Sequence, residues 1–199
     1  KGKYIVSDTS WQVSCYDKNW LKAGNWNFFS EIELPSHFKL PTKEIKPLKT
    51  IHEKKSILID FGKETFGYLK FLKIKGSGNV QIHYGESIEE ANSDSCETID
   101  YYFFKKESEE LYINPTTKAF RFIRISLDND LKLENFSNLY EYLPIEKKGY
   151  FKCSNNKLNE IWNVASYTLE LNTREFFLDG IKRDRWLWSG DATQCYLMN

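Results

Sequence analysis

The sequence of 199 residues contains few of the side chains that bind metals or cross-link small proteins. Its four cysteines, Cys15, Cys96, Cys153 and Cys195, lie far apart, and its 3 histidines are equally scattered. This spacing argues against a zinc site and against a Cys–His catalytic pair, so we expect no metal and no cofactor. The cysteines are expected to be free thiols in a reducing compartment, with one long-range disulfide as the alternative.

Long apolar segments and an excess of one charge are also lacking. No run approaches the roughly 18 apolar residues of a membrane-spanning helix, and residues 1–7 lack the apolar stretch of a signal peptide. Lys and Arg number 28, as do Asp and Glu, so the formal net charge is zero. Because nucleic acids and anionic membranes attract proteins with a basic excess, we expect neither as a partner. These features favour a soluble, cytoplasmic protein.

Between residues 56 and 144, short apolar runs alternate with turn residues, as in an all-β domain. Val80, Ile82 and Tyr84 alternate with polar residues at a period of two. In two runs the alternation slips by one residue, at Leu72 and at Ile123, which indicates a bulge or a strand buried on both faces, as in an antiparallel β-sandwich. Further strands are expected over residues 56–61, 68–75, 111–113, 120–127 and 131–133.

The sandwich is assigned to residues 51–147, and a different organisation is expected on either side of it. Residues 1–50 are interpreted as the tail of a preceding β module or as an arm packed on the sandwich. Pro35, Pro41 and Pro47 give the end of this segment the character of a linker.

After Lys147 the apolar pattern becomes helical. It predicts one helix that is capped by Ser154 or Asn156 and ends near Arg174, and a second helix that begins near Asp191. An apolar helical face needs a partner layer, and the sequence supplies little of one, so we expect the 199 residues to be part of a longer polypeptide. The face consists of Leu158, Ile161, Trp162, Ala165 and Leu169.

Residues 178–192 read LDGIKRDRWLWSGDA and concentrate carboxylates, cations and tryptophans. Gly180 and Gly190 are expected to let the backbone turn sharply. Carboxylates and guanidiniums bind vicinal hydroxyls, and indoles stack on the apolar face of a sugar. The segment therefore indicates a carbohydrate site, with a salt-bridged surface loop anchored by Trp186 and Trp188 as the alternative.

This segment resembles the signature loop of bacterial α-L-rhamnosidases of glycoside hydrolase family 78, in which an Asp is followed by Arg, an acid, Arg, Trp and Gly-Asp-Ala. Shorter strings agree with the family in order: DFG at 60–62, YGES at 84–87 and FRFIR at 120–124, then GYF at 149–151 and LNEIW at 158–162. The resemblance implies an antiparallel β-sandwich followed by the truncated start of a six-fold α/α barrel. Residues 148–199 would form the first helices and the acid loop of that barrel.

The resemblance also implies roles for five residues of the loop. Asp184 falls on the general acid of the family. Asp179 and Asp191 fall on carboxylates that hold sugar hydroxyls. Arg183 falls on a partner for hydroxyls or carboxylates, and Trp188 on an aromatic side chain of the sugar pocket.

The loop departs from the better-known members at two places. They carry Glu where Asp184 stands, and Cys-Pro at positions 180–181. Because the family inverts configuration and its general base lies downstream of Asn199, the chain is expected to be a fragment of an inverting hydrolase that removes terminal α-L-rhamnose and is inactive alone. Its expected partners are a rhamnoside and the remainder of the polypeptide. A non-catalytic carbohydrate-binding or accessory β-sandwich module is the alternative.

Overall fold

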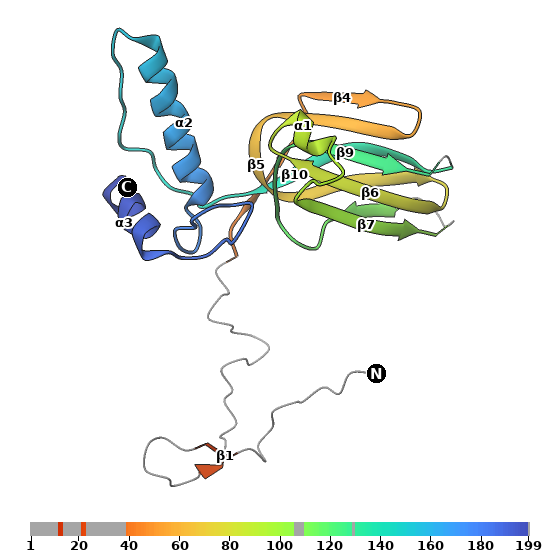
Figure 1. Ribbon diagram of the computed structural model, residues 1–199, viewed down its shortest axis with the longest axis horizontal. Coiled ribbons are helices and arrows are strands. Elements are labelled where there is room, and N and C mark those ends of the chain that lie inside the picture. The colour runs from red at the N-terminus through yellow and green to blue at the C-terminus, as the bar shows by residue number, and fades with distance from the viewer. Residues whose placement is uncertain (1–11, 14–20, 23–38, 106–109, 129, 199) are drawn as a thin grey trace. The chain divides into compact units, whose positions relative to one another are not determined.

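The computed structural model describes residues 12–13, 21–22, 39–105, 110–128 and 130–198 (Figure 1). The chain divides into two units, Lys1–Lys39 and Leu40–Asn199. In the first unit, β1 (Gln12–Val13) pairs antiparallel with β2 (Leu21–Lys22). Most of the tail or arm expected over residues 1–50 lies outside the described residues. The candidate site belongs to the second unit.

The second unit contains an eight-stranded antiparallel sheet. The main order is β3-β10-β5-β9-β6-β7, and β4 and β8 both pair with β5. Two short strands, β3 and β4, lie in the proline-punctuated stretch, with Pro41 and Pro47 just outside β3. The strands are β3 (Thr42–Ile45), β4 (Lys49–His52), β5 (Ser56–Lys75), β6 (Gly78–Gly85), β7 (Thr98–Phe104), β8 (Glu110–Ile113), β9 (Lys118–Leu127) and β10 (Lys132–Glu141).

The long strand β5 serves both layers of the sandwich. Its first part, 57–60, pairs with β4 on one side and β9 on the other, whereas 70–73 pairs with β8 and β10. The pairing with β9 is irregular between Asp60 and Thr65. Gly62, in this irregular part, has a φ of 84°, a conformation that residues other than glycine rarely adopt. The separate strands expected at 56–61 and 68–75 are therefore one strand that changes layer at an irregularity.

The core of the sandwich is built from apolar side chains of both layers. Phe61 and Phe120 pack edge to face with ring centroids 5.3 Å apart, and Phe71 packs against Tyr112 at 4.6 Å. The buried members of this core are Ile57, Ile59, Phe61, Leu69, Phe71, Val80, Ile82, Tyr84, Phe104, Phe120, Ile123, Ile125, Leu131, Leu133 and Phe136.

The strands are followed by helices α2 (Asn156–Asn172) and α3 (Ser189–Met198), while the short α1 (Ile88–Ala91) follows β6. The cap of α2 is Asn155, not Ser154 or Asn156: its Oδ1 accepts hydrogen bonds from the N–H groups of residues 157 and 158. The expected apolar face of α2 is largely exposed, with Leu158 at 47% and Ile161 at 55%. Among the described residues, none of the helices is both long enough and apolar enough to cross a membrane.

A second apolar cluster joins the helical segment to the sandwich. Leu171 at the end of α2 and Leu178 and Ile181 in the following loop are buried against three sandwich residues. Tyr167 adds a hydrogen bond from its hydroxyl to the Glu64 carbonyl at 2.6 Å. The sandwich partners in this cluster are Phe66, Ala119 and Tyr140. This cluster fixes the start of the candidate loop on the β domain.

Candidate active site

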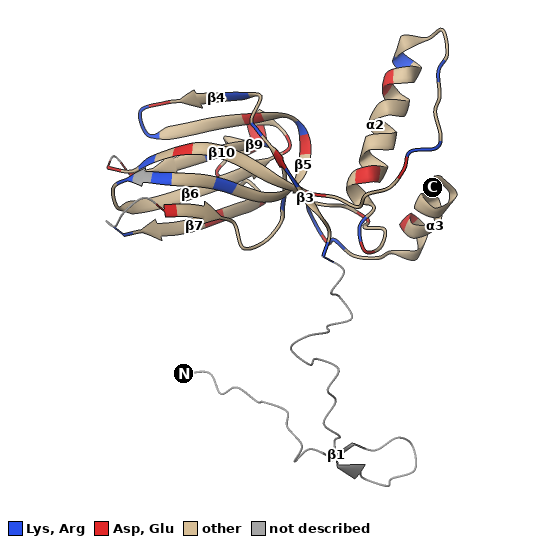
Figure 2. Ribbon diagram, turned by 180° about the vertical axis from the view of Figure 1, so that it is seen from behind, with Lys and Arg blue, Asp and Glu red and all other residues tan. Residues whose placement is uncertain are grey.

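The segment between α2 and α3 carries charges of both signs close together (Figure 2). It begins with Thr173, which bridges to Phe177, and with the buried Arg174. The Arg174 guanidinium donates to the carbonyl and to the carboxylate of Glu141 on β10, and it lies 4.7 Å from the centre of the Phe66 ring. Arg174 therefore attaches the beginning of the loop to the sandwich.

Asp179 closes the central part of the loop. Its N–H donates to the carbonyl of Trp186 at 3.0 Å. Its Oδ1 accepts hydrogen bonds at 2.9 Å from the N–H groups of Gly180 and of Trp186. One oxygen of the Asp179 carboxylate is thus used to hold residues 179–186 in a closed turn.

The sharp turn of the loop is made by Asp184 and Arg185, which have φ angles of 60° and 51°. The expectation that Gly180 and Gly190 supply the sharp turns is wrong, since the glycines with positive φ in the described chain are Gly62, Gly76 and Gly78. A left-handed backbone costs a residue with a side chain roughly 1–2 kcal/mol. Contacts elsewhere must therefore offset the cost of this turn.

Two hollows lie along the loop and bring four of the five expected site residues to solvent-accessible surfaces. One, of about 840 Å³, is lined by Asp179, Arg183 and Asp184. The other, of about 630 Å³, lies between α2 and α3 and is lined by Asp179 and Asp191. Arg183, Asp184 and Asp191 are exposed. Trp188 is 54% exposed and lines neither hollow.

The sandwich contributes charged side chains to the larger hollow that the sequence did not indicate. Glu64, Glu86, Glu97 and Arg121 line it together with the loop residues. Burial, together with the nearby charge of Glu86, raises the pKa of the Glu64 carboxyl to about 8. Glu64 lies in the sequence KET, which matches no functional motif. Only the structure, in which β5 and the loop lie together, shows that Glu64 lines the hollow.

Two of the upstream strings that resemble the family meet in the structure. Asp60 of the DFG string and Arg121 of the FRFIR string form an ion pair at 3.1 Å across β5 and β9. The Gly62 N–H donates to the same carboxylate at 2.6 Å. Although burial acts in the opposite direction, these contacts lower the pKa of Asp60. The pair stabilises the irregular part of β5 that borders the hollow.

A further ion pair ties the loop to the sandwich. Lys182 donates to the carboxylate of Glu90 in α1.

Within residues 39–105, 110–128 and 130–198, no group of three or more His, Cys, Asp or Glu side chains is arranged to hold a metal ion. The loop itself presents carboxylates and guanidiniums beside the larger hollow.

The fold and the loop together define a β-sandwich joined to the start of a helical glycosidase domain. The family described as alpha-rhamnosidase-like, bacteroidetes, N-terminal matches residues 1–125. The bacterial alpha-L-rhamnosidase 6 hairpin glycosidase domain matches residues 146–198. The chain belongs to the alpha-rhamnosidase-like family, as its loop sequence indicated. A comparison with curated protein sequences gave no match.

Solved rhamnosidase structures share this fold. A rhamnosidase from Klebsiella oxytoca with rhamnose bound is 23% identical, with a TM-score of 0.68 over 76% of this chain and 34% of its own. The family 78 rhamnosidase of Bacillus sp. GL1 is 22% identical, with a TM-score of 0.65 over 77% of this chain and 17% of its own. An α-L-rhamnosidase from Dictyoglumus thermophilum is 25% identical, with a TM-score of 0.57 over 73% of this chain and 18% of its own. The chain thus spans about a third or less of these relatives.

Proposed function

We propose that this chain carries the acid loop of an inverting glycoside hydrolase that removes terminal α-L-rhamnose from glycosides or polysaccharides. The supporting observation is the position of Asp184. It is exposed beside Arg183 at the larger hollow, on a loop that is attached to the sandwich at several points. Relatives with this fold include a rhamnosidase with rhamnose bound, which supports a rhamnoside as the substrate.

Asp184 is proposed as the general acid. It protonates the glycosidic oxygen as the bond to the anomeric carbon breaks, and water attacks that carbon from the opposite face. The proton of the water passes to a carboxylate base that a later part of the helical domain supplies. Because Asp is one methylene shorter than Glu, its backbone must come closer to the leaving oxygen, and the left-handed turn at Asp184 is a local means to do so.

The other four residues are proposed to bind the sugar. Asp179, Asp191 and Arg183 bind ring hydroxyls through charge-assisted hydrogen bonds. Since Oδ1 of Asp179 is engaged by the loop backbone, its Oδ2 is the atom assigned to the sugar. Trp188 presents an exposed indole to the methyl group of rhamnose.

One observation favours the alternative, an accessory carbohydrate-binding module. Several charged side chains of the loop region are used in structural contacts: Arg174 with Glu141, Lys182 with Glu90, and Asp179 with the loop backbone. A purely structural loop would look similar in these contacts. The two functions differ in whether Asp184 must carry a proton.

The deciding experiment is Asp184→Asn in the enzyme that contains the complete helical domain. We expect turnover of a rhamnoside with an alkyl aglycone to fall by about a hundredfold or more, because an amide keeps the shape but cannot donate the proton. The loss should be smaller with a nitrophenyl leaving group, which needs less protonation. Glu89→Gln, at an exposed position of α1, is the control. Equal losses on both substrates would assign the acid role to another residue, with Asp179 and Asp191 tested next.

The proposed location is the cytoplasm. Cys96, Cys153 and Cys195 are free thiols in the structure, which is compatible with a reducing compartment.

A further inference from the structure

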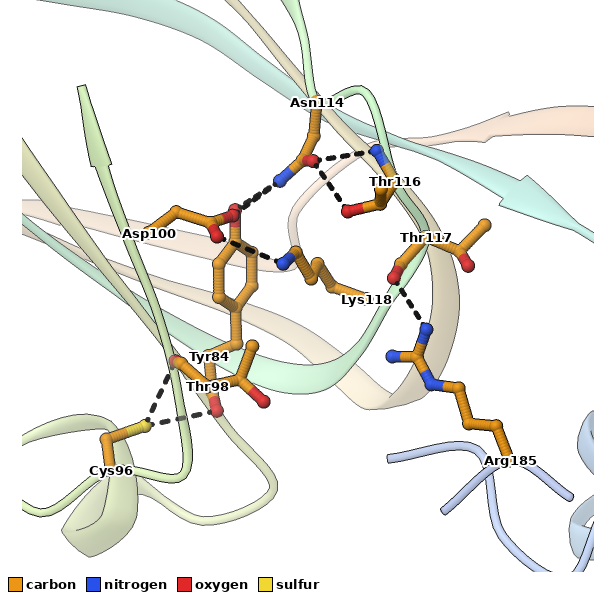
Figure 3. Close-up of polar contacts among 9 residues, drawn as sticks. All are labelled: Tyr84, Cys96, Thr98, Asp100, Asn114, Thr116, Thr117, Lys118 and Arg185. Atoms are coloured by element: carbon orange, nitrogen blue, oxygen red, sulfur yellow. Dashed lines mark hydrogen bonds and ion pairs between the residues drawn. The ribbon is translucent and has the colours of Figure 1, made fainter. Parts of the chain in front are cut away.

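The side chain of Arg185 leaves the loop and enters the sandwich. Its Nη1 donates to the carbonyl of Thr117 at 3.0 Å (Figure 3). Its guanidinium lies 5.0 Å from the centre of the Phe66 ring. The contact spans 68 positions of sequence. Burial lowers the pKa of Arg185. A partly buried guanidinium that both stacks and donates is a stronger anchor than an exposed ion pair.

The turn that carries Thr117 is held by a buried asparagine. Asn114 is 1% exposed and uses both ends of its amide. Its Nδ2 donates to the Tyr84 hydroxyl at 2.7 Å and to the Asp100 carboxylate at 2.9 Å. Its Oδ1 accepts from the N–H of Thr116 at 3.0 Å, as Figure 3 shows. The residue before Thr117 is therefore fixed to the core.

The residue after Thr117 is fixed as well. Lys118 donates from Nζ to the second oxygen of Asp100 at 3.0 Å, and both side chains are largely buried. Thr117 thus lies between two residues that are bound to one network of Asn114 and Asp100 (Figure 3). Its carbonyl is a fixed acceptor for Arg185.

The same residue, Arg185, shares the left-handed turn with Asp184. The N–H of Arg185 donates to the carbonyl of Arg183 at 2.7 Å, which closes the tight turn. The Arg185 side chain is held in the sandwich, whereas the neighbouring Asp184 side chain is exposed and lines the larger hollow. With the backbone between them bent in this way, holding the one side chain restricts where the other can lie.

We infer that Arg185 is a positioning residue for Asp184, and that the Asn114 network of the β-sandwich acts through the Thr117 carbonyl to hold the proposed acid in place. This inference rests on the proposed function. It assigns the sandwich a part in the geometry of the site, because the loop depends on the sandwich for the contact that stabilises its turn.

The test uses the enzyme with its complete helical domain and two rhamnosides, one with an alkyl and one with a nitrophenyl aglycone. Arg185→Ala is expected to lower kcat on the alkyl rhamnoside by about tenfold to a hundredfold, because small displacements of a catalytic group are costly. The loss on the nitrophenyl rhamnoside should be clearly smaller. Arg185→Lys should recover part of the activity, since an ammonium group can reach the Thr117 carbonyl but does not stack like a guanidinium.

A double-mutant cycle separates positioning from general destabilisation. If Arg185 acts through Asp184, adding Arg185→Ala to Asp184→Asn produces little further loss. A variant that only reduces the folded fraction lowers the rates on both substrates by the same factor, whether residue 184 is Asp or Asn. The control is Arg124→Ala, which removes a guanidinium that donates to the Asn92 carbonyl at 3.4 Å within the sandwich. It should leave the ratio of the two rates unchanged.

The outcomes distinguish this inference from the proposed function. If Asp184→Asn depends on the leaving group but Arg185→Ala lowers both rates equally, or the losses multiply in the double variant, the positioning role of Arg185 is refuted and the acid role of Asp184 stands. If Asp184→Asn itself lowers both rates equally, the acid assignment is refuted, and the role of Arg185 is refuted with it.

Discussion

Replacement of Glu64 by Gln should remove the pH dependence that this carboxyl imposes on stability. Glu64 lies on β5 at the larger hollow, and its Oε1 is buried with no hydrogen-bond partner among the described residues. Burial, the negative charges of Glu86 and Glu90 and the opposing charges of Lys182 and Arg121 leave its pKa at about 8, against a usual value of 4.5. The folded protein therefore holds a proton on Glu64 that the unfolded chain has lost.

The sign and size follow from proton linkage. Between pH 4.5 and 8 the folded state binds more protons than the unfolded state, so Glu64 makes the protein less stable as the pH rises through this window. Each pH unit changes the free energy of unfolding by about 1.4 kcal/mol, so roughly 3 kcal/mol is lost between pH 4.5 and 7. Gln resembles the protonated carboxyl and does not titrate. The free energy of unfolding of the Glu64→Gln variant, minus that of the parent, should therefore rise by roughly 3 kcal/mol between pH 4.5 and 7.

The measurement is urea unfolding of the 199-residue chain and its Glu64→Gln variant, followed by tryptophan fluorescence at several pH values between 4.5 and 8. The difference in free energy of unfolding between the two proteins isolates Glu64 from the other titrating groups. Glu89→Gln, at an exposed position, is the matched control and should show a flat difference. A difference for Glu64→Gln that changes by less than about 0.5 kcal/mol across this range would refute the reasoning, because the raised pKa predicts several times more.

Three further predictions concern activity and packing. The 199-residue chain alone should not hydrolyse an aryl α-L-rhamnoside above background, because it spans at most 34% of the solved rhamnosidases above; robust turnover would mean that the base lies within it. Trp188→Ala in the complete enzyme should narrow the preference for L-rhamnosides over L-mannosides, since a buried methyl group contributes about 0.8 kcal/mol; an unchanged ratio would exclude Trp188 as the methyl contact. Gly67→Ala should lower the melting temperature sharply, because a Cβ there would lie 2.2 Å from the Leu139 carbonyl oxygen. Gly149→Ala, with open space around it, should not, and equal melting temperatures for the two variants would contradict the packing argument.

The strand pattern was predictable wherever apolar residues alone face the core. Phe120 and Ile123 are both buried, and the slip between them corresponds to the irregular pairing of β5 with β9. The slip expected at Leu72 also has a counterpart, because the pairing of β5 with β10 shifts register between Lys70 and Leu72 and again between Lys73 and Lys75. Between these two shifts, Phe71 and Lys73 are buried, whereas Leu72 is half-buried. Lys73 is fully buried and donates from Nζ to the Lys105 carbonyl at 2.9 Å. A lysine on a core-facing position cannot be identified from periodicity, since its acceptor is set by tertiary structure.

The candidate site was predictable to the extent that its residues are neighbours in the sequence. The run from Asp179 to Asp191 concentrates the side chains that bind sugars, and residue type alone indicated the chemistry. The contacts that shape the loop join distant positions: Lys182 to Glu90, and Arg185 to Thr117, are 92 and 68 residues apart. Such contacts depend on how the loop docks on the sandwich, and no local pattern encodes it.

The packing of the loop on the sandwich also explains how this loop can carry Ile181 where the better-known members carry Pro. Ile181, at a position where they carry Pro, is 8% exposed in the cluster with Phe66 and Leu171. Burial of the Ile181 side chain therefore fixes the backbone at the start of the turn, as the ring of Pro could do in the better-known members. The far side of the turn is fixed by Arg185 on the same Phe66 ring. Because Ile181 belongs to the buried cluster that contains Phe66, and Arg185 lies over the Phe66 ring, the shape of the loop depends on the β-sandwich as much as on its own sequence.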